Sequence, residues 1–359
     1  MGVGVFSKIM KMHTAGEETV LVNVVRTDAG LDLPGKKLLY GKDGLRWGQL
    51  NSQLETKITA KVWECWGKYG LEKINFNEQS LEFFISPFGP PPRLLILGGG
   101  HIGAALSHLA AVLDLEIIVV DDRPSFASSQ QHPHAHQVIC DSFDHSLDML
   151  SLTTSDHIAI VTRGHRYDLL CLEKILSREK ETGKRVAYIG LIGSRSRVRA
   201  LLGKLADDGF DDKELARIYT PIGIDIGAET EGEIAISILA EITKVRKKEG
   251  FSSLKQMELL KELVNLEQTG GRAALVTIIN TFGSAPRKAG TQMLVYPDGR
   301  IMGTIGGGCG EADVKREALH VLDQGCCRTY KLNLTNDLAE QEGMACGGIM
   351  DLFLEPVNG

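Results

Sequence analysis

The sequence predicts an α/β protein: a central Rossmann-like, doubly wound parallel sheet flanked by two related, smaller β-rich α+β units. The middle of the chain alternates short apolar runs with stretches of helical periodicity, and a glycine-rich turn follows the first run. The two ends of the chain show weak internal similarity. A length of 359 residues is enough for two to three domains, at roughly 150 residues each.

The middle segment contains five apolar runs that we expect to be buried parallel strands joined by crossover helices. They are LLIL (94–97), EIIVV (116–120), QVIC (137–140), HIAIVT (157–162) and RVAYIG (185–190). A stiff Gly-Pro-Pro-Pro segment precedes them. We therefore expect a nucleotide-binding domain over 93–244, followed by a helical linker over 245–271.

The ends of the chain, 1–88 and 272–359, are predicted to be two copies of one β-rich unit. Three pairs of stretches match in the same order: LVNVVRT (21–27) with LVTIINT (275–281), PGKKLLYGKDG (34–44) with AGTQMLVYPDG (289–299), and LEFFISP (81–87) with MDLFLEP (350–356). The first copy lacks the glycine-rich cysteine loop of the second. We therefore expect the N-terminal copy to be a structural partner and the C-terminal copy to carry the function.

Composition excludes several classes of protein. The net charge of −6 argues against a general binder of nucleic-acid backbones. No apolar run reaches the roughly 18 residues of a membrane-spanning helix, so a cytoplasmic protein is expected. The seven cysteines include no CxxC pair, which argues against a disulfide framework and against a four-cysteine zinc site.

The turn after the first predicted strand has the G-x-G-x-x-G spacing of dinucleotide-binding loops. Its glycines are Gly98, Gly100 and Gly103. Asp121 lies 18 residues beyond the last of them, where a carboxylate would hold a ribose, and Asp122 follows it. His101, at the helix start, either faces the ligand or fills the turn. The loop thus indicates NAD or another adenine nucleotide; the alternative is a tight turn that binds nothing.

Two further loops follow predicted strands, where ligands of open α/β sheets bind. Residues 162–168 include His165 and Asp168 as candidate acid–base groups, unless these are plain first-turn helix residues. The next loop contains Gly193, Ser194 and Arg195. It is a candidate anion site with a serine N-cap, or a simple cap with solvated arginines.

Two other polar stretches suit structural roles. The histidines of QQHPHAHQV (130–138) are expected in a surface loop rather than at a metal, because a proline interrupts the alternation. Thr230 and Glu233 have the spacing of a capping box, which makes the glutamate a cap rather than a catalyst.

A second glycine-rich loop lies in the C-terminal unit, and it consists of Gly306, Gly307, Gly308 and Cys309. An amphipathic helix follows, which puts the cysteine at a helix N-terminus beside unhindered backbone N–H groups. Both features favour a thiolate. Arg287, in the stretch SAPRK, is a candidate cation for this site, and Cys346 is a second glycine-flanked cysteine. The alternative is a buried cysteine among turn glycines.

Taken together, these motifs resemble the xanthine dehydrogenase accessory family of XdhC/CoxI type. The matching stretches are GSAPRKAGTQMLVYPDGRIMGTIGGGCGEADV, CGGIMDLFLEP, LLILGGGHIGAAL, VVDDRP, TRGHRYD, YIGLIGSRSR and PIGIDIGAETEGEIAISILAEI. The resemblance implies a chaperone that binds molybdenum cofactor, supports its sulfuration by a cysteine desulfurase, and delivers it to a xanthine dehydrogenase-type hydroxylase.

The chain departs from the family pattern in domain order and in detail. The cysteine-loop unit normally precedes the Rossmann domain, whereas here it follows, with a degenerate copy in front. Gly310 stands where an apolar residue is usual. The altered order leaves open whether the cofactor site forms within one chain or across a homodimer, which we expect.

Three hypotheses follow. In the first, Cys309 faces the molybdenum or its sulfur, while Arg287 and the preceding glycines hold the pterin part. In the second, the protein is a nucleotide-dependent small oxidoreductase that uses His165 or Asp168. In the third, it is a scaffolding component of a xanthine dehydrogenase complex.

Overall fold

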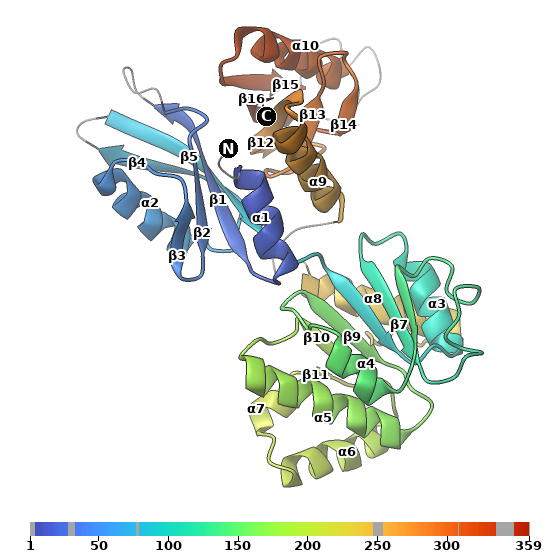
Figure 1. The fold of residues 1–359 in the computed structure, drawn as a ribbon. Helices are drawn as coiled ribbons and strands as arrows, with labels where there is room; N and C mark the ends of the chain where they lie inside the picture. Colours follow the sequence, from blue (N-terminus) through green and yellow to red (C-terminus); the bar gives the residue numbers. More distant parts are fainter. Residues whose placement is uncertain are drawn as a thin grey trace. The chain divides into compact units, whose positions relative to one another are not determined.

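The computed structural model describes residues 4–27, 33–76, 79–246, 254–307, 309–334 and 348–358. The chain divides into two compact units, which Figure 1 draws as ribbons. Unit 1 combines Met1–Gly89 with Gly250–Gly359, and unit 2 is Pro90–Glu249. Within the described residues, none of the helices combines the length and hydropathy needed to cross a bilayer.

Unit 2 contains one six-stranded parallel sheet. Its strands are β6 (Arg93–Leu97), β7 (Glu116–Asp121), β8 (Gln137–Cys140), β9 (Asp156–Ile160), β10 (Tyr188–Leu191) and β11 (Ile218–Tyr219). They lie in the order β11-β10-β9-β6-β7-β8, with every neighbouring pair parallel. Numbered within the unit, this is the Rossmann order 3-2-1-4-5-6. The predicted fold class is therefore confirmed, with β11 as a strand that the sequence analysis did not expect.

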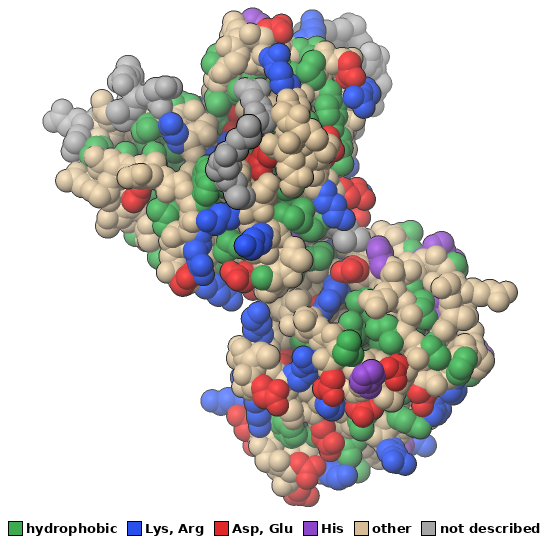
Figure 2. Space-filling model, in the orientation of Figure 1, with side chains coloured by type: hydrophobic (Ala, Val, Ile, Leu, Met, Phe, Trp, Pro, Cys, Tyr) green, Lys and Arg blue, Asp and Glu red, His purple; other side chains and the backbone are tan. Residues whose placement is uncertain are grey.

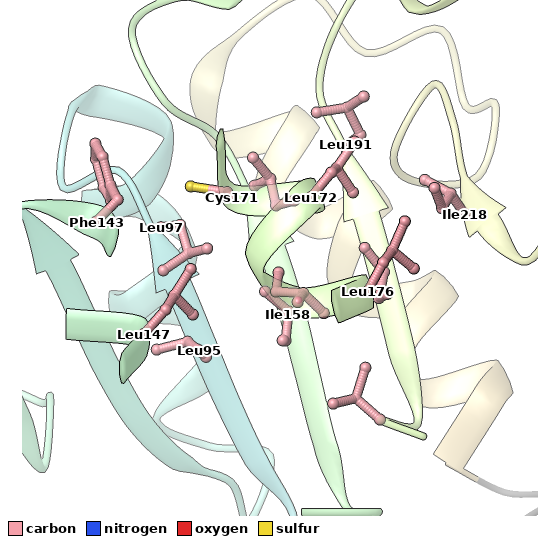
Figure 3. Packing of buried hydrophobic residues seen from close by; sticks show 14 of the residues in the cluster. Leu95, Leu97, Phe143, Leu147, Ile158, Cys171, Leu172, Leu176, Leu191 and Ile218 are labelled. Atoms are coloured by element: carbon pink, nitrogen blue, oxygen red, sulfur yellow. The ribbon is translucent and has the colours of Figure 1, made fainter. Parts of the chain in front are cut away.

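Helices cover both faces of this sheet because both faces are apolar. The helices are α3 (His101–Ala110), α4 (Phe143–Met149), α5 (His165–Thr182), α6 (Arg195–Asp207), α7 (Asp212–Leu215) and α8 (Glu231–Arg246). Leu95 and Leu97 of β6 pack toward α4 and α5, while Leu94 and Ile96 pack toward α3 and α8. Figure 3 shows the first layer, including the buried thiol of Cys171.

Unit 1 contains two five-stranded antiparallel sheets with the same strand order. The N-terminal β domain has β1 (Thr19–Thr27), β2 (Lys37–Gly41), β3 (Gly44–Trp47), α2 (Ser52–Glu64), β4 (Gly70–Phe76) and β5 (Gln79–Phe88). The C-terminal β domain has β12 (Arg272–Gly283), β13 (Gln292–Val295), β14 (Ile301–Gly303), α10 (Cys309–Gln324), β15 (Arg328–Asn333) and β16 (Gly348–Asn358). Their sheets read β3-β2-β1-β5-β4 and β14-β13-β12-β16-β15.

The two β domains also share local irregularities. The ladder between β1 and β5 shifts register after Val24, and the ladder between β12 and β16 shifts after Ile278. Gly48 and Gly303 occupy matching places with φ of 89° and 83°. Such backbone angles favour glycine, so both positions keep the residue that their turn requires.

Helices α1 (Val5–Thr14) and α9 (Leu254–Thr269) lie side by side in unit 1 (Figure 1). The Glu267 carboxylate of α9 caps α1, because it accepts the N–H groups of Phe6 at 3.0 Å and Ser7 at 2.8 Å. Leucines of α9, among them Leu263, are buried in a core that both β domains share. The segment expected as a linker is thus a core helix, because its apolar face has a partner that periodicity alone does not reveal.

Candidate functional site

The glycine loop of unit 2 has the geometry of a phosphate-binding turn. Gly98 has φ of 118°, and a Cβ there would lie 2.4 Å from the carbonyl oxygen of Val161. A Cβ on Gly103 would lie 2.0 Å from the carbonyl oxygen of Gly98, so α3 packs closely on the loop. A Cβ on Gly100 would meet no atom within 4 Å in the described part of the chain. The first and third glycines therefore serve packing, while the second leaves the backbone open to a ligand.

Asp121 is not available to hold a ribose, contrary to the sequence-based expectation. The residue is 1% exposed, and its Oδ2 accepts the Gly99 N–H at 2.9 Å. Its carboxylate also accepts the Arg123 backbone N–H at 3.0 Å and the Arg123 Nε–H at 2.9 Å. The carboxylate thus holds the glycine loop in place, because its oxygens accept hydrogen bonds from Gly99 and Arg123.

Asp122, the next residue, lies at the surface and pairs with Arg163 of the loop after β9. Arg163 also donates to the Tyr167 hydroxyl at 2.6 Å, and its guanidinium lies 4.3 Å from the centre of that ring. The Arg163 guanidinium, through its hydrogen bonds, holds the pKa of Asp122 below its usual range. This pair joins the carboxyl ends of β7 and β9, which flank β6 and its glycine loop.

Asp168 and His165 lie in the first turn of α5, beside the same loop. Asp168 is buried, and its Oδ1 accepts the Thr162 hydroxyl at 2.6 Å. Burial raises the pKa of the Asp168 carboxyl, against the opposing effect of the Thr162 hydrogen bond. The exposed His165 has its Nδ1 3.7 Å from Asp168 Oδ2. The structure thus brings the two residues together, with Asp168 tied to the loop that precedes its own helix.

Two other stretches differ in part from expectation. Ser194 is the N-cap of α6, yet its side chain makes no capping hydrogen bond and instead lies 3.3 Å from the Ser196 hydroxyl. His132 is 1% exposed rather than a surface residue, since its ring bonds Ser107 Oγ and the Phe126 carbonyl, each at 2.9 Å. His132 therefore packs the segment after β7 onto α3.

The remaining unit 2 candidates are placed as follows. Glu233 caps the start of α8 by accepting the backbone N–H of Thr230 at 2.9 Å, as its spacing predicted. His101 is exposed at the first position of α3, with its ring edge-on to Phe126. Gly193 follows β10 with φ of 154°. The backbone of Arg195 begins α6, and its side chain is outside the described part of the chain.

The cysteine loop of unit 1 connects β14 to α10, and Cys309 is the first residue of that helix. Gly306 and Gly307 have φ of 140° and 76°, and a Cβ on Gly307 would meet no atom of the described residues within 4 Å. The backbone therefore offers open space next to the thiol-bearing residue. Gly308 and the Cys309 side chain, as well as Cys346, lie outside the described residues.

Glu311, which the sequence analysis missed, organises this loop. Its Oε2 accepts the Thr304 hydroxyl at 2.7 Å and the Gly307 N–H at 3.1 Å, while the Gly306 N–H donates to Thr304 Oγ1 at 3.1 Å. Two of the N–H groups expected to face a ligand are thus bound within the chain. An acidic residue in the first turn of a helix was the available signal.

Arg287 lies beside this loop. A Cβ on Gly306 would be 2.6 Å from Pro286 and 3.9 Å from the Arg287 side chain. A Cβ on Gly348, the first residue of β16, would be 2.7 Å from the Ala285 backbone nitrogen. The segment around Arg287 therefore contacts both the cysteine loop and the start of the last strand.

The structure explains why position 310 is a glycine. A Cβ there would lie 3.0 Å from the side chains of Leu332 and Leu334. These leucines fill the space that an apolar residue at 310 would occupy.

On the face that Figure 2 shows, Lys and Arg side chains lie interspersed with Asp and Glu. Among the residues that the structure describes, no group of three or more His, Cys, Asp and Glu side chains is arranged to hold a metal ion.

Two family models match the chain. The XdhC Rossmann domain matches residues 94–242, and the XdhC and CoxI family matches residues 266–332. The first range coincides with the six-stranded sheet, and the second contains the cysteine loop. The chain belongs to the XdhC/CoxI family.

Curated relatives align over part of the chain. An uncharacterised Escherichia coli protein, YqeB, is 32% identical over 46% of this chain and 30% of its own length. A probable xanthine dehydrogenase subunit from Bacillus subtilis is 33% identical over 48% of each. The molybdenum cofactor insertion chaperone PaoD of Escherichia coli is 35% identical over 28% of this chain and 31% of its own. The alignments thus span less than half of each relative.

Among solved structures, a xanthine dehydrogenase from Bacillus halodurans aligns with 68% of this chain and 96% of its own. The sequence identity is 18% and the TM-score is 0.40.

Proposed function

We propose that this protein is an accessory chaperone that binds molybdenum cofactor and delivers it to a xanthine dehydrogenase-type hydroxylase. The family membership supports this role, as do relatives named for a xanthine dehydrogenase component and for cofactor insertion. The single structural observation that carries it is the open space at Gly307, two residues before Cys309 at the start of α10. Sulfuration with a cysteine desulfurase, and assembly as a homodimer, belong to the same proposal.

The residues of the cysteine loop fit such a cofactor. Gly307 leaves its backbone open, so a bulky ligand can approach without displacing a side chain. Cys309 supplies a soft sulfur ligand at a helix N-terminus, which suits molybdenum or a transferable sulfur. The exposed Arg287, packed beside Gly306, supplies a cation for the phosphate of the pterin.

Each of these residues has a distinct task in the proposed site. Bound cofactor supplies the molybdenum centre that the recipient hydroxylase needs. Arg287 neutralises the anionic end of the ligand. Glu311 holds Thr304 and the Gly307 N–H, and so keeps the loop in one conformation until the ligand enters.

Retention of freshly released molybdenum cofactor tests the proposal. The full chain is incubated with the cofactor and desalted, and the bound pterin is oxidised to its fluorescent form and quantified. We expect near-stoichiometric retention by the wild type, loss in Cys309→Ala, and no loss in Cys326→Ala, which changes an exposed cysteine of the same unit.

Two results would contradict this. Retention that all three proteins share equally would place the ligand away from the cysteine loop. Absence of retention in the wild type would refute the chaperone role.

We also propose that the glycine loop of unit 2 binds a nucleotide, because Gly100 is open to solvent in a Rossmann sheet. Gly100→Val should weaken binding of NAD or ADP at least tenfold, since the added side chain fills the space a phosphate needs. Gly203→Val, at another open glycine on α6, should leave binding unchanged. Equal affinities in calorimetric titration would refute a site at this loop.

A further inference from the structure

The contacts between the two β domains of unit 1 are reciprocal. Tyr69, just before β4, packs on Gly290, where a Cβ would lie 2.4 Å from its ring. Cys327, just before β15, packs on Gly35, where a Cβ would lie 2.6 Å from its sulfur. Because β4 corresponds to β15 and the two glycines precede corresponding strands, each domain makes the same contact with the other. Reciprocal contacts of this kind define a two-fold, isologous interface.

The apolar centre of the interface follows the same symmetry. Val25 and Phe84 of the N-terminal β domain share one buried cluster with Ile279 and Phe353 of the C-terminal β domain. Phe84 pairs with Asn23 across its sheet, and Phe353 pairs with Thr277. The matching registers make the two phenylalanines equivalent, and all four side chains are nearly inaccessible to solvent.

One polar cluster breaks this equivalence. Glu355 of β16 is 2% exposed, and its carboxylate forms an ion pair with Lys37 of β2. It also accepts the Asn23 side-chain amide of β1 at 2.9 Å. The anion thus comes from the C-terminal β domain, whereas the cation and the amide come from the N-terminal β domain.

The equivalent positions on the other side of the interface are uncharged. Strand registers place Ser86 where Glu355 stands, Gln292 where Lys37 stands, and Thr277 where Asn23 stands. Gln292 donates to Thr277 at 3.2 Å, a bond within its own domain. One half of the interface is therefore ionic and the other half neutral, although the backbone is the same.

We propose that the buried Lys37–Glu355 pair makes this interface heterotypic, so that each C-terminal β domain accepts an N-terminal β domain and rejects a second copy of itself. Pairing of two C-terminal β domains would bury Glu355 against Gln292 and Thr277, with no cation. Pairing of two N-terminal β domains would bury Lys37 against Ser86. Leaving a buried charge without its partner is strongly unfavourable, whereas the paired charges specify the partner.

The proposal assigns a role to the N-terminal β domain, which has no cysteine loop of its own. It serves as a built-in partner that covers one face of the C-terminal β domain, and a second chain cannot bind that face. Any association between chains would then use another surface.

A double-mutant cycle in the full chain tests the pairing. All three tryptophans, at positions 47, 63 and 66, lie in the N-terminal β domain, so their fluorescence follows unit 1 during thermal unfolding. Lys37→Gln and Glu355→Ser should each lower the melting temperature by roughly 10 °C, because each leaves one buried charge. Lys37→Gln with Glu355→Ser recreates the neutral half of the interface. Its melting temperature should fall by much less than the sum of the decreases in the two single variants.

The double variant also tests partner choice. With both halves neutral, two chains can exchange domains, so light scattering should show dimers that increase with concentration beyond those of the wild type. Arg300→Gln with Asp298→Asn removes an exposed ion pair within the C-terminal β domain, and should change neither readout.

Additive losses in the cycle, or a mass distribution identical to the wild type at every concentration, would overturn the proposal.

Discussion

Protonation of His13 should make unit 1 sensitive to mild acid. The side chain is 3% exposed in α1, and neither ring nitrogen has a hydrogen-bond partner among the residues that the structure describes. Burial lowers the pKa of His13 from 6.5 to about 4, because the charged imidazole loses its hydration. Between these values the unfolded chain binds the extra proton and the folded chain does not. The stabilisation is therefore complete above pH 6.5 and is lost as the pH falls.

The magnitude follows from the two pKa values. One pKa unit corresponds to about 1.4 kcal/mol, so lowering the pH from 7.5 to 5 should cost unit 1 about 2 kcal/mol through His13 alone. His13→Phe keeps a flat ring and removes both the titration and the two unpartnered nitrogens. This variant should therefore lose that pH dependence and be more stable than the wild type at pH 5.

Urea unfolding followed by tryptophan fluorescence at both pH values measures this difference. The readout is confined to unit 1, since Trp47, Trp63 and Trp66 all lie there. His320→Gln changes an exposed histidine of the same unit and should behave as the wild type. If wild type and His13→Phe lost the same free energy between pH 7.5 and 5, burial of a neutral His13 would not control the acid response.

Three further outcomes are expected. Gly103→Ala should destabilise unit 2 by about 1–3 kcal/mol, because the new Cβ would lie 2.0 Å from a loop carbonyl oxygen, whereas Gly100→Ala should be tolerated. Hydrogen exchange of the amides of α3 measures the difference in stability between the two variants. Glu267→Gln should lower the free energy of unfolding of unit 1 by about 1 kcal/mol in the fluorescence assay, because it weakens the cap of α1. An unchanged free energy would show that this cap does not stabilise the unit. Burial raises the pKa of the Cys171 thiol, so this residue should resist a thiol reagent at pH 8 while the exposed Cys140 reacts. Equal reaction rates of the two cysteines would contradict the packing shown in Figure 3.

Much of the fold was predictable because it depends on local patterns. The apolar runs at 94–97, 116–120 and 137–140 became β6, β7 and β8 with bounds that agree within one residue. The run at 185–190 was shifted, since the strand covers Tyr188–Leu191, and β11 was missed because two residues show no periodicity. Helix α9 was predicted as a helix, but its burial was not.

The candidate sites divide along the same line. Glycine spacing predicted the loop at Gly98–Gly103, because a sharp turn and close packing demand glycine wherever they occur. The direction in which a carboxylate points depends on the donors around it, which residue spacing does not show, so Asp121 was assigned to a ligand although it binds Gly99 and Arg123. His132 was placed at the surface because no local pattern shows that its ring meets Ser107, which lies 25 residues earlier, and the Phe126 carbonyl.

The amino-acid sequence by itself determined the class of fold, the two glycine loops and the family, because each rests on residue types at short, fixed spacings. Only the tertiary structure decided that α9 belongs to the core and that Lys37 faces Glu355. These pairings join residues that the sheets and helices bring together from distant parts of the chain. Their energies depend on burial and on the partner, which no local pattern records.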